Sequence, residues 1–397
     1  MKEKEKRYSL VRYLAGALPA RLGDEMSDQA ILLVALAATG SIRAGSTVLA
    51  GLTVSTAIGG PLLGTFLDRS NNPGRILTSA LILYAIGLAI IAFSLGRIPL
   101  WAVVLCALIA GFFMPAISGG WSSRLKTFIA DEQMAHASAI DATTFNIAGL
   151  IGPGIAGLIA ASFGAYWAVA ALIALLALAL PMAWRLPRHT ARQHMTSFAQ
   201  DVASGFNIIL KNKALLRITL VSVISYMGIG MLWVIYPLVG KELLGKAGYG
   251  GLLASVLSVS ALVATMAYTK WRTKYSPDTM AFVTTIVLAL AMGILLLAHH
   301  VWIAVVAMLI SGLADGPQLA AIFTVRHRGA PERLRSQVFT TGASLKITAA
   351  AVGAEIAGVI ASRSLSMTIT VAGLAQVLAT LVFITCTVLE KRPNITK

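Results

Sequence analysis

The sequence predicts an all-α membrane protein with about twelve transmembrane helices in two six-helix bundles related by pseudo-two-fold symmetry. Three observations predict this fold class. Hydrophobic residues form 57% of the 397 residues, charged residues form only 12%, and the mean hydropathy is +0.80. Apolar stretches of about 18 residues or more recur along the chain. One glycine-rich phrase also occurs twice, once in each half. A soluble globule of this length cannot hide so much apolar surface from water.

The candidate spans are each long enough to cross a hydrocarbon core of ~30 Å as a helix. They lack the period-2 alternation of barrel strands. In the first half they cover residues 10–38, 44–67, 75–95, 98–122, 136–161 and 165–184. In the second half they cover residues 215–240, 248–269, 279–298, 301–325, 337–361 and 365–389.

The net charge of +16 follows from topology. Most of the 32 Lys and Arg residues fall in segments that lie on one side of a twelve-span arrangement. The positive-inside rule puts that side, with both termini, in the cytoplasm. We therefore expect no nucleic-acid partner. The loops on the other side contain only Arg43, Arg97, Lys241, Lys246 and Arg363.

The two halves repeat one design. The phrase "IGPGIAGLIA" at 151–160 returns as "VGAEIAGVIA" at 352–361, and "LIAGFFMP" at 108–115 returns as "LISGLADGP" at 309–317. A parallel repeat of two six-span halves, with a site between them near the midplane, is a common transporter construction. The predicted domains are residues 1–184, a cytoplasmic linker at 185–214, and residues 215–397.

Within the linker, "SFAQDVASGFNIIL" carries apolar residues at helical spacing. Two interpretations stay open, a helix on the inner membrane surface and a solvated linker with some helix. The spacing concerns Phe198, Val202, Phe206 and Ile209.

The stretch "GTFLDRSNNPGR" between spans two and three combines a glycine with an acid and two arginines. Gly64 permits close helix approach, while Asp68 and Arg69 can pair with a neighbouring helix or its dipole and so act as a conformational latch. Here the chain resembles the major facilitator superfamily, whose loop carries a Gly-x-x-x-Asp-Arg-x-Gly-Arg pattern. The extra residues before Gly74 depart from that pattern. The matches are Gly64, Asp68, Arg69, Gly74 and Arg75.

The span-five phrase resembles the motif of the drug:proton antiporter branch of that superfamily, Gly-x-x-x-Gly-Pro-x-x-Gly-Gly. Gly152, Pro153 and Gly157 match it, whereas Ala148 and Ala156 replace two glycines. An ordinary close-packed face of small residues is the alternative. The stretches "LGDEMSDQA" and "GFNIILKNKALLR" also look like antibiotic-efflux members with twelve spans. The resemblance implies the major facilitator fold and proton-coupled efflux.

Charges inside the spans each cost ~2.5 to 3.5 kcal/mol at a helix centre on insertion scales. Asp24 lies about 21 Å into span one and Asp315 is similarly central in span ten. Lys346 lies on a slim face of span eleven. These groups could exchange protons or hold substrate, or they could form a static ion-pair network. The full candidate set is Asp24, Asp315, Glu355, Glu25, Asp28, Arg21 and Lys346, with Asp141 read as interfacial or structural.

Glu355 stands where the first half has Gly154, immediately after the position matching Pro153. It lies about 28 Å from the inner end of its span. If it faces a cavity, it could be an outer proton acceptor. If it faces another helix, it is a packing contact or a gate.

Cofactor and metal sites are not expected. Cys106 and Cys386 lie inside predicted spans, and the six His residues lack ligand spacing. The segment "GKELLGKA" at 240–247 has the spacing of a phosphate-binding loop, but Ala247 stands where Ser or Thr must reach magnesium. We therefore expect no bound nucleotide and a transport reaction driven by an ion gradient.

The leading hypothesis is a secondary transporter of the plasma or inner membrane, not an enzyme, that exports an amphipathic small molecule in exchange for protons. We expect a monomer whose first span is retained as an anchor. The alternative is uptake or symport of a polar or anionic metabolite, with Lys346 and Arg21 holding the anionic group. A membrane enzyme and a sensor that binds ligand without net flux are remote alternatives.

Overall fold

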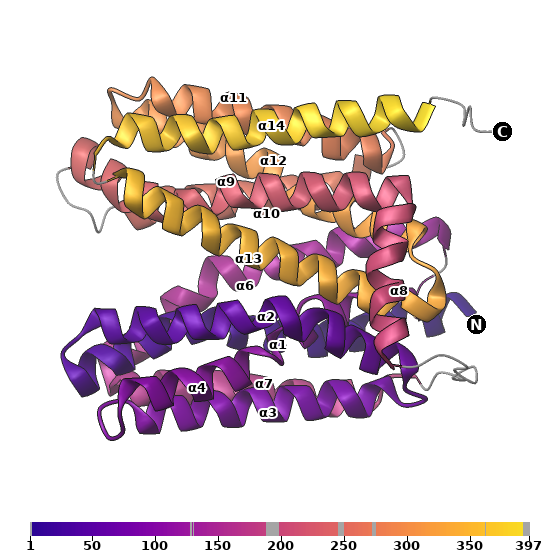
Figure 1. Ribbon diagram of the computed structural model, residues 1–397, viewed down its shortest axis with the longest axis horizontal. Helices are drawn as coiled ribbons and strands as arrows, with labels where there is room; N and C mark the ends of the chain where they lie inside the picture. The colour runs from indigo at the N-terminus through magenta and orange to yellow at the C-terminus, as the bar shows by residue number, and fades with distance from the viewer. Residues whose placement is uncertain are drawn as a thin grey trace. The chain divides into compact units, whose positions relative to one another are not determined.

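The computed structural model describes residues 2–127, 129, 131–187, 198–244, 250–271, 275–361 and 363–391, and their regular structure is helical throughout. Residues 245–247 of the phosphate-loop-like segment lie outside these ranges. Within the described part, eleven helical segments are long and apolar enough to cross a membrane. The predicted all-α membrane class is therefore confirmed (Figure 1).

In the described part of the first half, the chain forms seven α-helices. The bounds are α1 (Lys2–Thr39), α2 (Ile42–Arg69), α3 (Pro73–Ser94), α4 (Leu100–Gly111), α5 (Gly119–Ser122), α6 (Met134–Phe163) and α7 (Ala165–Trp184). Short 3-10 helices lie at Met114–Ala116, Leu125–Thr127 and Asp131–Gln133. The helix α1 begins before the predicted span and continues through Pro19. Its charged residues keep it outside the eleven apolar segments.

The second half begins with a shorter helix and continues with long ones. The bounds are α8 (Phe198–Lys211), α9 (Lys213–Leu244), α10 (Gly250–Trp271), α11 (Pro277–Leu296), α12 (Val301–Gly329), α13 (Arg335–Ala361) and α14 (Leu365–Lys391). A 3-10 helix at Glu332–Leu334 precedes α13. The predicted helical stretch of the linker is confirmed as α8 (Figure 1).

The fourth predicted span, residues 98–122, corresponds to one apolar segment, Leu100–Thr127, but its α-helix is interrupted after Gly111, which the sequence interpretation did not anticipate. Pro115 lacks a backbone donor and follows the end of α4. An added Cβ at Gly111 would lie 2.0 Å from Leu52 O, so α4 ends in backbone contact with α2. The matching α12 contains Pro317 and stays continuous.

Three glycines with positive φ terminate helices in the first half. Gly40 (φ 66°) follows α1, Gly96 (φ 77°) follows α3, and Gly164 (φ 101°) follows α6. Only glycine enters this region without strain, so each fixes a tight reversal into the next helix.

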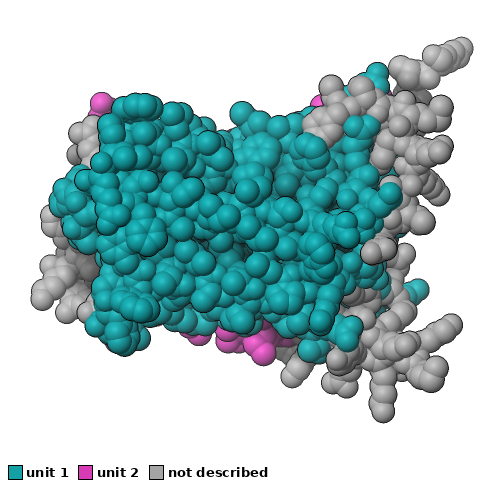
Figure 2. Space-filling view, turned by 90° about the horizontal axis from the view of Figure 1, so that it is seen from below, with its two compact units in different colours: residues 1–137, 144–206, 331–348 teal, residues 138–143, 207–330, 349–397 magenta. Residues whose placement is uncertain are grey.

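The described chain divides into two compact units, coloured in Figure 2. Unit 1 comprises residues 1–137, 144–206 and 331–348, and unit 2 comprises 138–143, 207–330 and 349–397. The predicted boundaries at 184 and 215 stay predictions.

Each unit has its own apolar core and helix pairing. In unit 1, α1 packs on α7 and α2, α3 packs on α7 and α4, and α2 packs on α4. In unit 2, α9 packs on α14 and α10, α11 packs on α14 and α12, and α10 packs on α12. The unit 1 core includes Leu77, Leu81, Trp121 and Leu172, and the unit 2 core includes Met231, Ile235, Met292 and Met308.

Candidate functional site

The acidic face of α1 is tied to α3 through a buried tyrosine. The hydroxyl of Tyr84, which is 1% exposed, donates to Asp24 Oδ1 at 2.8 Å. Ser27 Oγ lies 3.2 Å from the same hydroxyl. Tyr84 therefore fixes the position of the Asp24 carboxylate near the middle of α1. The sequence interpretation missed Tyr84 because it lies in an otherwise apolar run.

Glu25, the next residue of α1, packs against α6. A Cβ added at Gly152 would lie 3.0 Å from Glu25 Cβ, and one at Gly149 would lie 3.9 Å from Glu25 Oε2. The first glycine of the antiporter-like phrase is thus the residue that lets α1 carry an acid at this crossing. Around Gly157 the described structure leaves open space, and Pro153 is exposed.

Arg21, one turn before Glu25, is 1% exposed. Its guanidinium donates to the hydroxyl groups of Thr144 and Ser122, the latter at 2.9 Å. It also stacks on Phe145, with the Arg21 Cζ 3.7 Å from the ring centroid. These contacts bind α1 to α6 and α5.

Lys346 of α13 approaches the same ring, with its Nζ 5.9 Å from the Phe145 centroid. Its charge attracts that of Glu25. The structure thus brings Arg21 and Lys346 to the Phe145 ring within unit 1, and Glu25 interacts with Lys346. Asp28, one turn beyond Asp24, has an exposed side chain. The described residues contain no group of His, Cys, Asp and Glu that could hold a metal ion.

The latch residue Asp68 joins three segments of unit 1. Its carboxylate pairs with Arg124 at 3.1 Å and accepts hydrogen bonds from the backbone N–H groups of Ser336 (3.0 Å) and Gln337 (2.8 Å). Because α13 begins at Arg335, these are N–H groups of its first turn, which have no acceptor within the helix. Asp68 therefore caps α13 from a distant helix.

Glycines make this approach possible. A Cβ at Gly64 would lie 2.2 Å from Thr340 Oγ1, and one at Gly60 would lie 1.9 Å from Ser344 Oγ. A Cβ at Gly119 would lie 2.4 Å from Phe339 O. The sequence interpretation identified Gly64 and missed the other two.

The remaining residues of the proposed latch are Gly74, Arg75 and Arg69. A Cβ at Gly74 would lie 2.5 Å from Ala183 O, so Gly74 brings the start of α3 against the end of α7. Arg75 is exposed and lies over Trp184 at 5.3 Å from the ring centroid. Arg69 is half-buried.

Asp315 is half-buried on α12 in unit 2. Its charge acts on the hydroxyls of Tyr226 and Tyr236 on α9. On either side of it, Gly312 and Gly316 press α12 against α10, because an added Cβ would lie within 2.3 Å of α10 backbone oxygens. Asp315 therefore projects from a helix that is tightly held.

Glu355 is exposed on α13. Two residues earlier, Gly353 lies against α9, since an added Cβ would lie 1.9 Å from Met227 O. Side chains two residues apart point to roughly opposite sides of a helix, so Glu355 points away from α9. At the matching Gly154 of α6, the described structure has nothing within 4 Å of an added Cβ.

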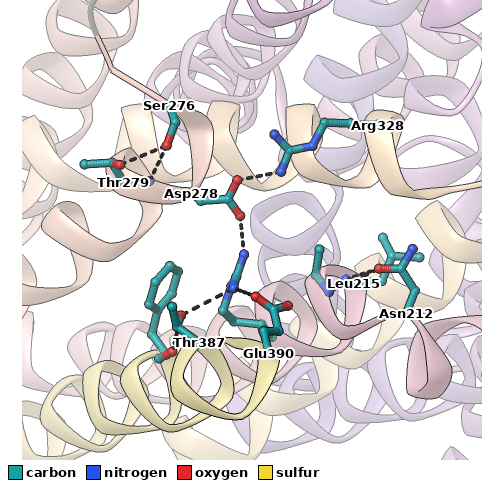
Figure 3. Close-up of polar contacts among 11 residues, drawn as sticks. Asn212, Leu215, Ser276, Asp278, Thr279, Arg328, Thr387 and Glu390 are labelled. Carbon is teal, nitrogen blue, oxygen red and sulfur yellow. Dashed lines mark hydrogen bonds and ion pairs between the residues drawn. The ribbon is translucent and has the colours of Figure 1, made fainter. Parts of the chain in front are cut away.

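The sequence interpretation also missed an ion-pair network in unit 2, because it counted Arg217 only as a topological charge. Arg217 pairs with Asp278 of α11 and Glu390 of α14, and Arg328 of α12 pairs with Asp278. In Figure 3, Asp278 and Glu390 approach the same arginine side chain. Thr387 accepts a further hydrogen bond from Arg217 at 3.3 Å. Arg217 therefore joins the ends of α9, α11 and α14, and Arg328 adds the end of α12 through Asp278.

A second polar cluster lies in the interior of unit 2. Ser225 Oγ donates to Gln376 at 2.7 Å, Gln376 Nε2 donates to Ser225 O at 2.8 Å, and Gln318 Nε2 donates to Thr285 Oγ1 at 2.9 Å. Ser225 Oγ also lies 3.3 Å from Gln318 Oε1. The cluster links α9, α11, α12 and α14 by satisfied hydrogen bonds.

Proteins of similar sequence identify the family of this chain. The family model described as Major Facilitator Superfamily matches residues 13–353 and 218–397. The chain is 27% identical to the uncharacterized MFS-type transporter y4rN of Sinorhizobium fredii, over 93% of both proteins. It is 25% identical to the multidrug efflux pump Tap of Mycolicibacterium fortuitum, over 90% of both. It is 24% identical to the multidrug resistance protein MdtG of Yersinia enterocolitica, over 73% of this chain and 70% of that protein.

Solved structures share the fold. A bacterial homologue of the iron transporter ferroportin, in an outward-facing state, superposes with a TM-score of 0.78 at 14% identity and covers 96% of this chain and 99% of its own. The human organic anion transporter MFSD10 gives a TM-score of 0.77 at 15% identity, covering 95% and 99%. The chain therefore belongs to the Major Facilitator Superfamily and is a multi-pass membrane transporter rather than an enzyme.

Proposed function

We propose that the protein is a secondary active transporter that exports an amphipathic small molecule in exchange for protons by alternating access. The proton-coupling groups are Asp24 and Glu25 on α1 and Asp315 on α12. Asp28 on α1 and Glu355 on α13 are exposed acids that act behind them.

The single observation that carries this proposal is the setting of the two adjacent acids of α1. Asp24 is held by the buried hydroxyl of Tyr84, while Glu25 packs on Gly152 of the antiporter-like phrase. A carboxylate that changes its protonation during transport must be both positioned and reachable from a moving helix. Glu25 lies against Gly149 and Gly152 of α6, which carry no side chains, and this supports a role in coupling.

The proposed architecture has twelve spans, with bundles at residues 1–184 and 215–397 joined by 185–214. The pairing of helices supports the repeat, because each pair named for unit 1 has its counterpart in unit 2: α1 with α7 matches α9 with α14, and α2 with α4 matches α10 with α12. We place the protein in a bacterial-type inner membrane with both termini on the cytoplasmic side, since most basic residues of the sequence gather on one side of the twelve-span arrangement. The proposed unit of function is a monomer.

The proposed latch is Asp68 with Gly64, supported by Arg69 and Arg75. A carboxylate that caps a helix and pairs with Arg124 stabilises one arrangement of α2 and α13. The names of the relatives support export: Tap is called a multidrug efflux pump and MdtG a multidrug resistance protein. A further relative, from Planococcus maritimus, is named a Na(+), Li(+), K(+)/H(+) antiporter.

The decisive experiment uses the full chain in proteoliposomes with an imposed pH gradient and a panel of cationic dyes. Asp24→Asn is expected to abolish gradient-driven transport while dye exchange without a gradient persists. Glu242→Gln, which changes an exposed acid at the end of α9, serves as the matched control. Unchanged coupled flux in Asp24→Asn would remove Asp24 from the mechanism.

A second candidate function is uptake or symport of an anionic metabolite. The observation in its favour is that Arg21 and Lys346 both approach the Phe145 ring. Two cations beside one aromatic ring could hold a carboxylate-bearing substrate. Counterflow with organic acids, sugars and cationic dyes, in wild type and Lys346→Gln, separates the two functions: loss of organic-acid counterflow supports uptake, and loss of dye counterflow supports export. Ligand binding without any flux would indicate a sensor.

A further inference from the structure

Unit 1 contains a small cavity that the transport proposal does not use. It measures about 210 Å³ and lies between the first part of α1, the segment after α5 and the end of α7. Its lining includes Arg12 and Tyr13 of α1, Trp121 of α5, and Met182 and Arg185 at the end of α7. The three segments are far apart in sequence, so the fold alone creates this chamber.

The cavity is electropositive. Arg12 and Arg185 both line it, and none of the described residues in its wall is acidic. Both guanidinium groups line the same small space, so an anion held there would be attracted by both. Arginine is also the side chain best suited to phosphate, because its planar fork offers paired donors.

A third donor belongs to Trp121. The side chain is fully buried, and its indole N–H has no hydrogen-bond partner among the described residues. The ring is fixed in place, since an added Cβ at Gly16 would lie 2.4 Å from Trp121 Cζ2 and Tyr13 packs on it edge-on at 6.3 Å. A buried donor without an acceptor is rare and calls for a bound group or water.

Size and surroundings indicate the kind of anion. Pockets for drug-sized ligands measure roughly 300 to 1,000 Å³, so this cavity is too small for the transported molecule and large enough for a phosphate group. Beside the two arginines, Val11 (59% exposed) and Trp184 (57% exposed) form apolar outer surface. Exposed tryptophan at the end of a span is typical of the headgroup level of a bilayer.

We propose that this cavity binds the phosphate group of an anionic membrane lipid, with Arg12 and Arg185 as the charged ligands and the Trp121 indole as a neutral donor. Basic pockets between transmembrane helices on the cytoplasmic side recognise such headgroups. The lipid is the source that the flanking apolar surface favours, because acyl chains can lie along it.

The test is native mass spectrometry of the detergent-purified full chain titrated with phosphatidylglycerol, phosphatidylcholine or inorganic phosphate. Wild type is expected to retain phosphatidylglycerol preferentially. Arg12→Gln combined with Arg185→Gln should weaken this binding by about tenfold or more, and Trp121→Phe by a smaller factor. Arg97→Gln, an exposed arginine of the same unit with an aromatic neighbour, should bind as wild type does.

Equal retention of phosphatidylcholine and phosphatidylglycerol would overturn the proposal. Displacement of the lipid by an equimolar amount of inorganic phosphate would overturn the lipid as the source of the anion. If the double variant does not fold, Trp121→Phe keeps the ring and removes only the donor. Wild-type lipid affinity in a folded Trp121→Phe protein would then exclude the indole from the site.

Discussion

Asp68 and Gln337 are separated by most of the chain, yet the carboxylate Oδ2 of Asp68 accepts a hydrogen bond from the backbone N–H of Gln337 at 2.8 Å. The amide side chain of Gln337 donates in turn to Val202 O of α8 at 2.8 Å. The first turn of α13 is therefore held by α2 and by α8 at the same residue. A change at either contact should loosen the same helix end.

Asp68→Asn is expected to loosen the α13 terminus. The substitution keeps the shape of the side chain but removes the charge that stabilises the helix N-terminus and Arg124, contributions of about 1 to 3 kcal/mol for a charged hydrogen bond. Hydrogen–deuterium exchange of the peptide that contains residues 335–341 should become faster, and transport should slow. Glu132→Gln, an exposed acid of the same unit, is the control. Unaltered exchange in that peptide would mean that Asp68 does not cap α13.

Gly64→Ala is expected to be destabilising. The new Cβ would lie 2.4 Å from Gln337 Cα, which is backbone and cannot rotate away. Overpacking of this kind costs typically about 1 to 3 kcal/mol. The melting temperature of the purified protein should fall. Gly154→Ala, where the added Cβ meets nothing within 4 Å, should leave it unchanged or raise it slightly. Equal melting of the two variants would contradict the close approach.

Tyr84→Phe is expected to alter the pH dependence of transport. The ring and its packing remain, but Asp24 loses the hydrogen bond that its carboxylate accepts, a net contribution of about 0.5 to 1.5 kcal/mol or somewhat more for a charged acceptor. The pH at which coupled transport is half-maximal should move, while dye exchange without a gradient keeps its rate. Tyr275→Phe removes an exposed hydroxyl and controls for the substitution itself. A profile identical to wild type would show that Tyr84 does not act through Asp24.

Arg217→Gln is expected to destabilise unit 2. The arginine side chain is 7% exposed, and its removal takes from Asp278 and Glu390 the cation that they share, although Asp278 keeps its pair with Arg328. Breaking a buried pair costs about 3 to 5 kcal/mol, and partial exposure of both acids should reduce this to roughly 1 to 3 kcal/mol.

Arg328→Gln is the matched comparison for Arg217→Gln. Its side chain is 55% exposed and pairs with the same Asp278, so its loss should cost less than about 1 kcal/mol. Thermal unfolding followed by tryptophan fluorescence measures both variants, and raised salt should affect Arg328→Gln less than wild type. A larger loss from Arg328→Gln than from Arg217→Gln would disprove the central place of Arg217.

The helices were predictable because apolar length is a local property that each stretch of sequence carries by itself. The interruption of the helix after Gly111 also has a local cause, the glycines and the proline of "GFFMPAISGG". The high hydropathy of the whole segment concealed this signal. Asp68 was identified as a residue that meets a helix dipole. Its partner, the start of α13, could not be named because nothing near Asp68 in sequence specifies a contact so far along the chain.

In the candidate site, too, some residues were identifiable from local sequence and others only from the structure. Charged residues inside apolar spans stand out by their cost, so Arg21, Asp24 and Lys346 were identifiable from sequence. Neutral groups that position them, such as Tyr84 and Phe145, are ordinary membrane-helix residues and carry no signal. Arg217 was visible, but pairing it with Asp278 and Glu390 needs three-dimensional proximity between three different helices.

At Gly60 and Gly64 the bare backbone of α2 meets the backbone of α13 and the small polar side chains of Thr340 and Ser344. Parting such surfaces uncovers little apolar area, so the hydrophobic effect contributes little to the work of separation. Most of that work falls on the few polar bonds at Asp68. The strength of this closure is therefore set by electric charge, and a single protonation or a change in the local field can weaken it without any repacking of the helices.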